Sequence, residues 1–269
     1  ALDAHGLKLN VKKCVFNQQR LTFLGHVISQ EGVIPDPTKV RAVQDWPVPT
    51  NLHEIRGFLG FANYYRKFIP NYALVSAPLT DLTKTTSPNC GKMTEESTKA
   101  FHEIKNLLIK APTLAYPKTG PDASFTIVTD ASHKAIGMAL HQEQDGLQRP
   151  LAFEARKLST HEQNYPVQEQ ELLAVVEALR VFRTYIEGCR SITLFTDHHS
   201  LTTFLSHKNL TGRKARWAEQ IRPYANYLMI VHRPWKNNHV DGLSRRSDLM
   251  LHVVSTTQTP FLQHVADAS

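Results

Sequence analysis

Cysteine and long apolar stretches are scarce in this chain of 269 residues, and no signal-peptide pattern opens it. Its three cysteines, Cys14, Cys90 and Cys189, are odd in number and far apart, which predicts neither a disulfide framework nor a cysteine-based zinc site. No run of 18 apolar residues occurs, so a transmembrane helix is not expected. The first residues do not join a basic start to an apolar core, as a secretory signal would. We therefore expect a reducing compartment and no membrane span.

The composition also lacks the features of a disordered chain. Apolar residues make up 41% of the sequence and charged residues 20%, which is typical of globular domains. The chain begins with Ala1 rather than Met, and we expect it to be a piece of a longer protein.

Positive charge is in excess and is concentrated near the end of the chain. The formal net charge is +7, which predicts a polyanionic partner such as nucleic acid or a membrane surface but does not separate the two. Residues 207–246 carry nine Lys or Arg against two acidic residues, interleaved with Trp and Tyr. An ordinary solvated face and a folded surface for phosphates are both open interpretations of this stretch.

Apolar periodicity divides the chain into four sections. Residues 1–34 predict short strands, with a turn at residues 30–32. Residues 35–118 predict helices, among them one that Thr50 caps and one over residues 95–110. Residues 119–247 predict strands and helices in the order βββαβααβα, which suits a mixed α/β sheet with helices on its faces. Residues 248–269 show no strong period and predict a tail or linker.

Four acidic residues occupy notable places in the third section. Asp130 and Asp197 each end an apolar strand in the dipeptide Thr-Asp, Glu171 lies early in the long helix of residues 167–186, and Asp241 begins the last helical turn. If the two strands are parallel neighbours, both aspartates lie at the same sheet edge. Clustered carboxylates repel one another unless cations intervene, and their oxygens suit Mg²⁺ or Mn²⁺. The alternative is that each acid is separately a cap or a surface residue.

Longer motifs resemble a known family. The segments TDASHKAIGMAL, LFTDHHSL and HRPWKNNHVDGLSR, with the long stretch between them, resemble the ribonuclease H domain of gypsy-type LTR retrotransposon Pol polyproteins. Upstream, LTFLGHVIS and HEIRGFLGFANYYRKFIPNYA resemble the end of the reverse transcriptase of the same polyproteins. The resemblance implies a ribonuclease H-like mixed five-stranded sheet with flanking helices over 119–247. It also implies a mainly helical thumb and connection region over 35–118 and a palm-end β-hairpin within 1–34.

The resemblance also implies an activity, which is metal-dependent hydrolysis of the RNA strand of RNA–DNA hybrids. Asp130, Glu171, Asp197 and Asp241 match the acids that hold two Mg²⁺ ions, with Mn²⁺ as a substitute. His232 matches a position near the metals, where either a proton-transfer role or no role is open. The residues that match nucleic-acid contacts are Phe23, Leu24, Gly25 and His26 in a primer-grip hairpin, and Arg213, Lys214, Arg216, Trp217, Arg233 and Lys236 in the basic stretch.

Departures from the family keep a second hypothesis open. No Asp-Asp pair occurs in the chain, so polymerase activity is not expected without a separate palm and fingers portion, which would be a partner. Gly242 follows Asp241 where the family usually has Ala, and Trp235 replaces a usual Gly. The alternative to a nuclease is a non-catalytic nucleic-acid-binding relic or domesticated fragment. A retroelement protein would reside in cytoplasmic particles or in the nucleus.

Overall fold

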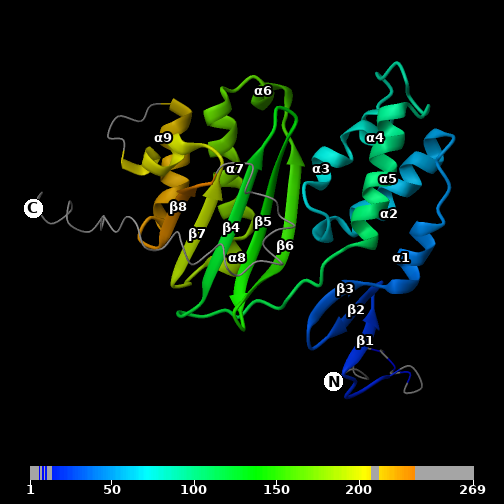
Figure 1. Cartoon of the computed structure of the whole chain (residues 1–269), viewed down its shortest axis with the longest axis horizontal. Helices are drawn as coiled ribbons and strands as arrows, with labels where there is room; N and C mark the ends of the chain where they lie inside the picture. The colour runs from blue at the N-terminus through cyan, green and yellow to red at the C-terminus, as the bar shows by residue number, and fades with distance from the viewer. Residues whose placement is uncertain (1–5, 7, 9, 11–13, 207–211, 234–269) are drawn as a thin grey trace, which may run out of the picture.

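The computed structural model describes residues 14–206 and 212–233, together with residues 6, 8 and 10 (Figure 1). The described helices and strands form a three-stranded sheet, a group of helices and a five-stranded sheet with its own helices. In chain order they are β1 (Arg20–Phe23), β2 (His26–Ser29), β3 (Gly32–Pro35), α1 (Pro37–Gln44), α2 (Leu52–Tyr64), η3 (Arg66–Phe68), α3 (Tyr72–Val75), α4 (Ala77–Asp81), α5 (Glu95–Ile109), β4 (Ser124–Ala131), β5 (Ala135–Gln144), β6 (Leu147–Lys157), α6 (Thr160–Gln163), α7 (Val167–Val181), α8 (Arg183–Ile186), β7 (Ser191–Thr196), η4 (His199–Ser206), α9 (Gly212–Ile221), η5 (Arg222–Tyr224) and β8 (Leu228–His232).

The five-stranded sheet has the order β6-β5-β4-β7-β8. Strands β4, β5 and β6 are antiparallel neighbours, whereas β7 runs parallel to both β4 and β8. This mixed sheet confirms the predicted ribonuclease H-like α/β fold, including the expected parallel neighbours. The long helix predicted over residues 167–186 is wrong in one respect. Phe182 takes a non-helical backbone conformation and packs in the core, which divides the helix into α7 and α8.

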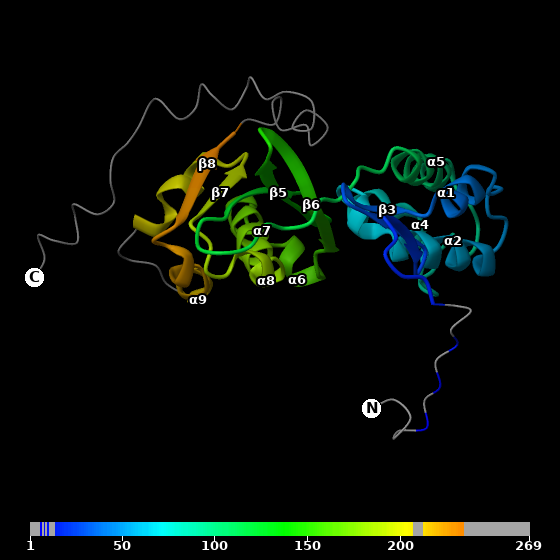
Figure 2. The same ribbon diagram turned by 90° about the horizontal axis from the view of Figure 1, so that it is seen from below.

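Each face of the five-stranded sheet buries a different set of helices, because side chains alternate across a strand. Ile127, Leu140 and Leu194 pack with α7 in one core. Val128 and Phe195 point to the opposite face and pack with the helices of residues 37–109, which we call the helical unit. Figure 2 shows the helical unit beyond the β6 side of the sheet, separated from α7.

The helical unit has its own aromatic centre. Phe58 of α2 and Phe101 of α5 are fully buried, with ring centroids 4.5 Å apart. The predicted cap at Thr50 is wrong by one residue. Asn51 is the N-cap of α2, since its side chain accepts the backbone N–H of Glu54, and the Glu54 carboxylate in turn accepts the N–H of Thr50. Asn reaches the free N–H groups of a first helical turn as well as any residue, so the neighbour takes the role.

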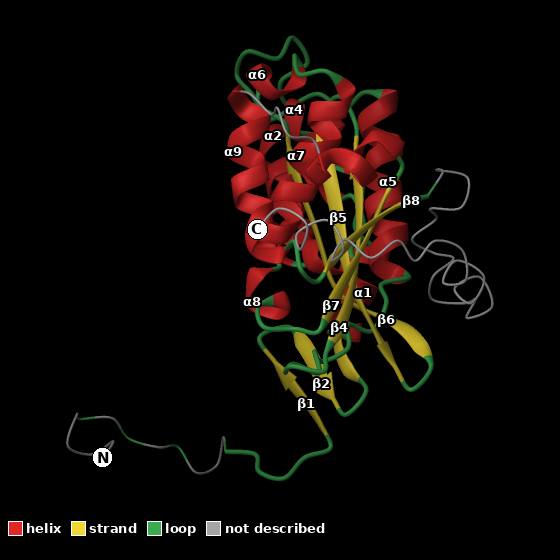
Figure 3. Cartoon of the chain, turned by 90° about the vertical axis from the view of Figure 1, so that its left-hand side faces the viewer, coloured by secondary structure: helices red, strands yellow, loops and turns green. Residues whose placement is uncertain are grey.

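The small sheet β1–β3 is antiparallel and joins the linker before β4. Backbone hydrogen bonds connect Val33 and Leu114 in both directions. Gly32, at φ +134°, allows this approach, because a Cβ there would meet the Leu114 carbonyl oxygen at 2.2 Å. The prediction of short strands over residues 1–34 is wrong for the described residues before β1, which pair with no described strand. Figure 3 shows this sheet at the lower end of the molecule, away from α6.

No helix among the described residues combines the length and the apolar character needed to cross a bilayer.

Replacing Phe58 with Ala should lower the free energy of unfolding by about 3–5 kcal/mol, because removal of this fully buried ring leaves a cavity in the core. Urea unfolding followed by circular dichroism measures the change. The control is Phe16→Ala, because Phe16 is exposed and its loss should change stability by less than about 0.5 kcal/mol. Equal effects of the two substitutions would contradict this account of the core.

Candidate active site

The carboxyl ends of two parallel strands bring two aspartates to one edge of the five-stranded sheet. The last paired residues of β4 and β7 are Val128 and Phe195. Two residues further along each strand direction lie Asp130 and Asp197. The threonines between them are fully buried, and the Thr129 hydroxyl donates to the Phe195 carbonyl at 3.3 Å. In each Thr-Asp pair, the buried threonine therefore holds the strand end in the protein, and the aspartate follows it at the sheet edge.

Helix α7 adds a third carboxylate from the face beneath the sheet. Glu171 is only 2% exposed, in a helix buried on every side from Gln170 to Leu179. One carboxylate oxygen of Glu171 accepts the backbone N–H of Ala131, which follows Asp130 in β4. The other oxygen, Oε2, is buried without a hydrogen-bond partner. An unpartnered buried carboxylate oxygen is costly, so this one marks a place where a cation or donor is missing.

The three carboxylates act on one another electrostatically. Burial, followed by the charges of Asp197 and Asp130 and a hydrogen bond with Asp197, raises the pKa of Glu171 to about 9. Burial, followed by the charge of Asp197, raises the pKa of Asp130 to about 6, against a lowering by a hydrogen bond from Asn71. Without a cation, the cluster therefore holds a proton at neutral pH.

The donor set fits a hard divalent cation by its chemistry. All three described acids offer oxygen, and the orphaned Glu171 oxygen faces the neighbourhood of two further carboxylates. Within residues 14–206 and 212–233, however, no group of three or more His, Cys, Asp or Glu side chains is arranged so that it could hold a metal ion as it stands. The fourth predicted acid, Asp241, lies outside the described residues.

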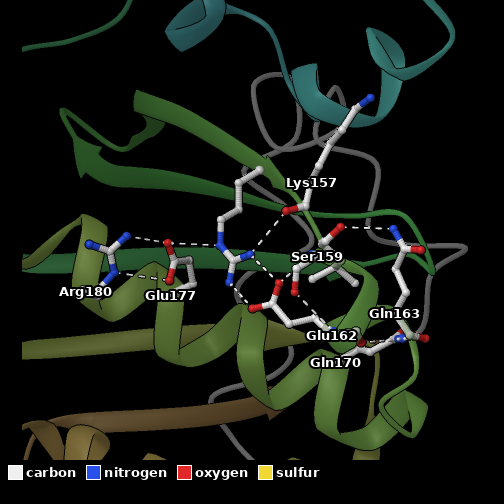
Figure 4. A network of polar contacts seen from close by, with 9 residues as sticks. Lys157, Ser159, Glu162, Gln163, Gln170, Glu177 and Arg180 are labelled. Carbon is white, nitrogen blue, oxygen red and sulfur yellow. Dashed lines mark hydrogen bonds and ion pairs between the residues drawn. The ribbon is translucent and has the colours of Figure 1, made fainter. Parts of the chain in front are cut away.

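A network of charges holds α7, and with it Glu171, against β6 and α6. Figure 4 shows Glu162 of α6 and Glu177 of α7 at its centre, with Arg180 beside Glu177. Arg156 of β6 donates two hydrogen bonds of 2.9 Å to Glu162 and approaches Glu177 at 3.3 Å. The Arg156 hydrogen bonds lower the pKa of Glu162 to about 2. The network thus fixes the helix that carries the buried acid.

His232 lies at the end of β8, opposite Thr196 of β7. Its Nε2 atom donates to the backbone carbonyl of Asp197 at 3.0 Å, and its ring packs edge-on against His199. The structure therefore brings His232 to the acids through the main chain of Asp197. Arg233 follows, with its guanidinium over the Phe195 ring.

The predicted nucleic-acid contacts in α9 divide into exposed and buried residues. Arg213 stacks over the Tyr165 ring and pairs with Glu169, which Lys214 also approaches. Arg216 is exposed, and it lines an open groove together with Arg213, His161 and Gln220. Trp217 packs into the sheet core at 8% exposure, so its ring supports the groove from beneath. Lys236 lies outside the described residues.

The predicted primer-grip residues form a tight turn between β1 and β2. Leu24 and Gly25 both have positive φ, and Phe23 and Leu24 are largely exposed. His26 turns inward instead. Its Nδ1 donates to the Leu24 carbonyl, and its Nε2 is buried among the rings of Tyr64, Tyr65 and Phe68. Burial lowers the pKa of His26. The ring supports the turn through its hydrogen bond to the Leu24 carbonyl.

One residue at the site escaped sequence analysis. Asn71, which precedes α3 in the helical unit, donates a side-chain hydrogen bond of 3.3 Å to Asp130. The two residues are 59 positions apart and in different sections of the chain, so no spacing or periodicity could have paired them.

Comparisons with known proteins agree on a lineage. Residues 120–224 match the family described as the RNase H-like domain found in reverse transcriptase. The chain is 37% identical over 91% of its length to the Pol polyprotein of transposon opus, and 34% identical over 91% to that of transposon gypsy, both from Drosophila melanogaster. It is 33% identical over 90% of its length to the transposon Tf2-3 polyprotein of Schizosaccharomyces pombe. The chain covers about a quarter or less of these relatives, namely 25%, 24% and 18%.

A solved structure shares the fold. The foamy viral protease-reverse transcriptase in complex with an RNA/DNA hybrid matches with a TM-score of 0.64 and 23% identity, over 82% of this chain and 30% of that one. The same protein in complex with double-stranded DNA matches with the same TM-score, over 83% of this chain and 47% of that one.

Stability without metal should fall as pH rises through the two raised pKa values. An acid whose folded-state pKa exceeds its unfolded value of about 4 binds an extra proton on folding, so its contribution is complete below about pH 4. It is lost progressively above about pH 4, and the loss is complete near pH 6 for Asp130 and near pH 9 for Glu171. At pH 8, Glu171→Gln should therefore raise the free energy of unfolding by about 2 kcal/mol, with no gain at pH 4.5.

Urea unfolding in a chelator at both pH values tests this expectation. Asp122→Asn removes an exposed acid from the opposite end of β4 and should leave the pH profile of the wild type unchanged. A gain for Glu171→Gln that is the same at pH 4.5 and pH 8 would show that the effect is not electrostatic.

Proposed function

The chain belongs to the gypsy-type retrotransposon Pol polyproteins and carries their RNase H-like domain, and from that premise we propose that it hydrolyses the RNA strand of RNA–DNA hybrids with divalent metal ions. The observation that carries the proposal is the edge of the five-stranded sheet. There Asp130, Glu171 and Asp197 come from two strand ends and a helix, and burial together with the neighbouring negative charges raises the pKa values of Asp130 and Glu171. A structural role alone gives no reason to gather three repelling carboxylates.

The proposed ligands are Asp130, Glu171, Asp197 and Asp241, holding two Mg²⁺ ions, with Mn²⁺ as a substitute. Such ions supply an activated water and stabilise the leaving oxygen of a phosphodiester. Glu171 would hold a cation as the deprotonated carboxylate, since metal ligands bind deprotonated. His232 orients Asp197 through its main-chain carbonyl. The alternative assignment of His232 as a proton carrier requires that this hydrogen bond open.

The proposed substrate rests on charge and on a structural relative. The chain is basic, and Arg213 and Arg216 line the groove beside α6, with Lys214 next to Arg213 in the same helix. The foamy viral relative was solved with an RNA/DNA hybrid. We propose that this chain takes the same class of duplex and reads its shape and 2′-hydroxyl groups, since the wide minor groove of such helices displays both.

A palm and fingers portion is the proposed protein partner. All four residues of β1 are exposed, and the turn after it presents Phe23 and Leu24 to solvent. An unpaired strand edge with apolar neighbours is a surface that a further part of a reverse transcriptase would cover. Polymerase activity would reside in that partner.

Asp130→Asn should reduce metal-dependent cleavage of a labelled RNA–DNA hybrid by about 1,000-fold or more, because losing a metal ligand removes several kcal/mol of transition-state stabilisation. Hybrid binding, measured by fluorescence anisotropy, should persist. Gel analysis of both strands should show cuts in the RNA alone with Mg²⁺ or Mn²⁺.

Asp122→Asn is the matched control and should cleave as the wild type does. Cleavage by Asp130→Asn at the wild-type rate would overturn the assigned site. Hybrid binding by the folded wild-type protein without cleavage in either metal would favour the non-catalytic relic.

Arg216→Ala should weaken hybrid binding similarly for all base sequences and reduce the salt slope of log K by about one unit, if this exposed side chain contacts a phosphate. Anisotropy titrations at several salt concentrations measure the slope. Arg190→Ala is the control, since Arg190 precedes β7 at the sheet end opposite Asp197. Equal slopes for the two variants would place the phosphate contacts elsewhere.

A further inference from the structure

The helical unit reaches the acidic cluster through one side chain. Asn71 Nδ2 donates a hydrogen bond to Asp130 Oδ2 at 3.3 Å. The contact joins the start of α3 to the end of β4, and both side chains are partly buried.

A glycine on the neighbouring strand makes room for this contact. Gly137 of β5 lies directly opposite Asp130 in the antiparallel register, so both residues face the same side of the sheet. A Cβ built on Gly137 would stand 1.8 Å from Asn71 Oδ1 and 2.9 Å from its Cγ, and its three nearest neighbours all belong to Asn71. The missing side chain at 137 is thus filled by the Asn71 amide.

The side-chain amide of Asn71 makes no capping hydrogen bond with α3. Asn71 is the N-cap of α3, a position at which Asn normally accepts a hydrogen bond from the helix. Its side chain makes no such bond, and its backbone is left-handed, at φ 51° and ψ 31°. Asn tolerates this conformation better than most residues with a side chain. The backbone therefore directs the amide toward the sheet.

Ion pairs on either side hold the helical unit in place. Arg66 of η3 approaches Glu154 of β6 at 3.7 Å, and Lys157 at the end of β6 pairs with Asp81 of α4 at 3.2 Å. Asn71 lies between these two attachments in the chain. Its position relative to Asp130 consequently depends on the docking of the whole helical unit.

We propose that Asn71 is a positioning residue for Asp130, which makes the metal-holding geometry of the nuclease site depend on the docked helical unit. The amide holds one carboxylate oxygen and thereby sets the direction of the other. Hydrogen-bond partners of metal-binding carboxylates act in this way, and their loss weakens metal binding or activity by about 10- to 100-fold. The inference rests on the proposed function, because the cation is the ligand that Asp130 would take.

The first test is Asn71→Gly, which keeps the left-handed backbone accessible and removes only the amide. Isothermal titration calorimetry with Mn²⁺ should show binding about 10- to 100-fold weaker than in the wild type. The Mg²⁺ concentration for half-maximal hybrid cleavage should rise with it, while the Kd for the hybrid stays unchanged. Asn17→Gly is the matched control, since Asn17 is an exposed Asn with φ 52°, and both metal measurements should remain at wild-type values.

The second test uses the contact with Gly137. Gly137→Ala alone should displace the Asn71 amide, weaken Mn²⁺ binding and lower the Tm. In the double variant, Asn71→Gly with Gly137→Ala, the added methyl group meets no side-chain amide. Of the three atoms nearest to a Cβ at position 137, only the Cα of residue 71, at 3.7 Å, is left. The double variant should therefore match Asn71→Gly in both Mn²⁺ affinity and Tm, rather than adding the two losses.

The outcomes separate this inference from the proposed function. Wild-type cleavage together with unchanged Mn²⁺ binding and Mg²⁺ dependence in Asn71→Gly overturns the positioning role and leaves the nuclease intact. Faster cleavage by Asn71→Gly also overturns it, because the contact would then block the site. Weaker Mn²⁺ binding in Asn71→Gly without hybrid cleavage by the wild type supports the positioning role and rejects the nuclease.

Discussion

Repulsion among carboxylates is the constraint on which the rest of the structure depends. The parallel pairing of β4 with β7 places Asp130 and Asp197 at one sheet edge, and α7 brings Glu171 beneath them. In water these groups would move apart. In the folded protein the buried Thr129 and Thr196 hold the strand ends, so the acids stay together, and burial with the neighbouring negative charges raises the pKa values of Asp130 and Glu171 instead. The proposed cations would relieve this repulsion, and the unpartnered oxygen of Glu171 is its clearest sign.

The parts of the molecule that hold the acids come from separate elements. Arg156 and its two glutamate partners secure α7 on one side of the site. On the opposite face of the sheet, the helical unit packs over Val128 and Phe195 and supplies the Asn71 contact. The candidate site therefore lies between two cores, and a change in the docking of either one reaches the same carboxylates.

Two residues that the resemblance assigns to nucleic-acid contacts, Trp217 and His26, have rings that pack largely against the protein. Trp217 packs in the core beneath the basic groove, and His26 sits under the turn that exposes Phe23 and Leu24. A sequence motif marks that a position matters to a local structure, but it does not tell whether the side chain faces solvent. Packing against neighbouring elements decides whether a side chain faces solvent, and here the rings of Tyr64, Tyr65 and Phe68 pack against His26.

Sequence alone determined the strands of the five-stranded sheet, the helical segment that carries Glu171 and the two Thr-Asp strand ends, because apolar periodicity is a local property. It also pointed to Glu171 among the glutamates of α7, through resemblance to a family. Two helix boundaries depended on individual contacts. The Asn51 side chain caps the first turn of α2, and Phe182 packs in the core where α7 ends. Only the tertiary structure decided which face of the sheet meets the helical unit, and with it the approach of Asn71 to Asp130 across the bare Gly137. That contact joins residues 59 positions apart, and it exists because two independently patterned surfaces bury each other.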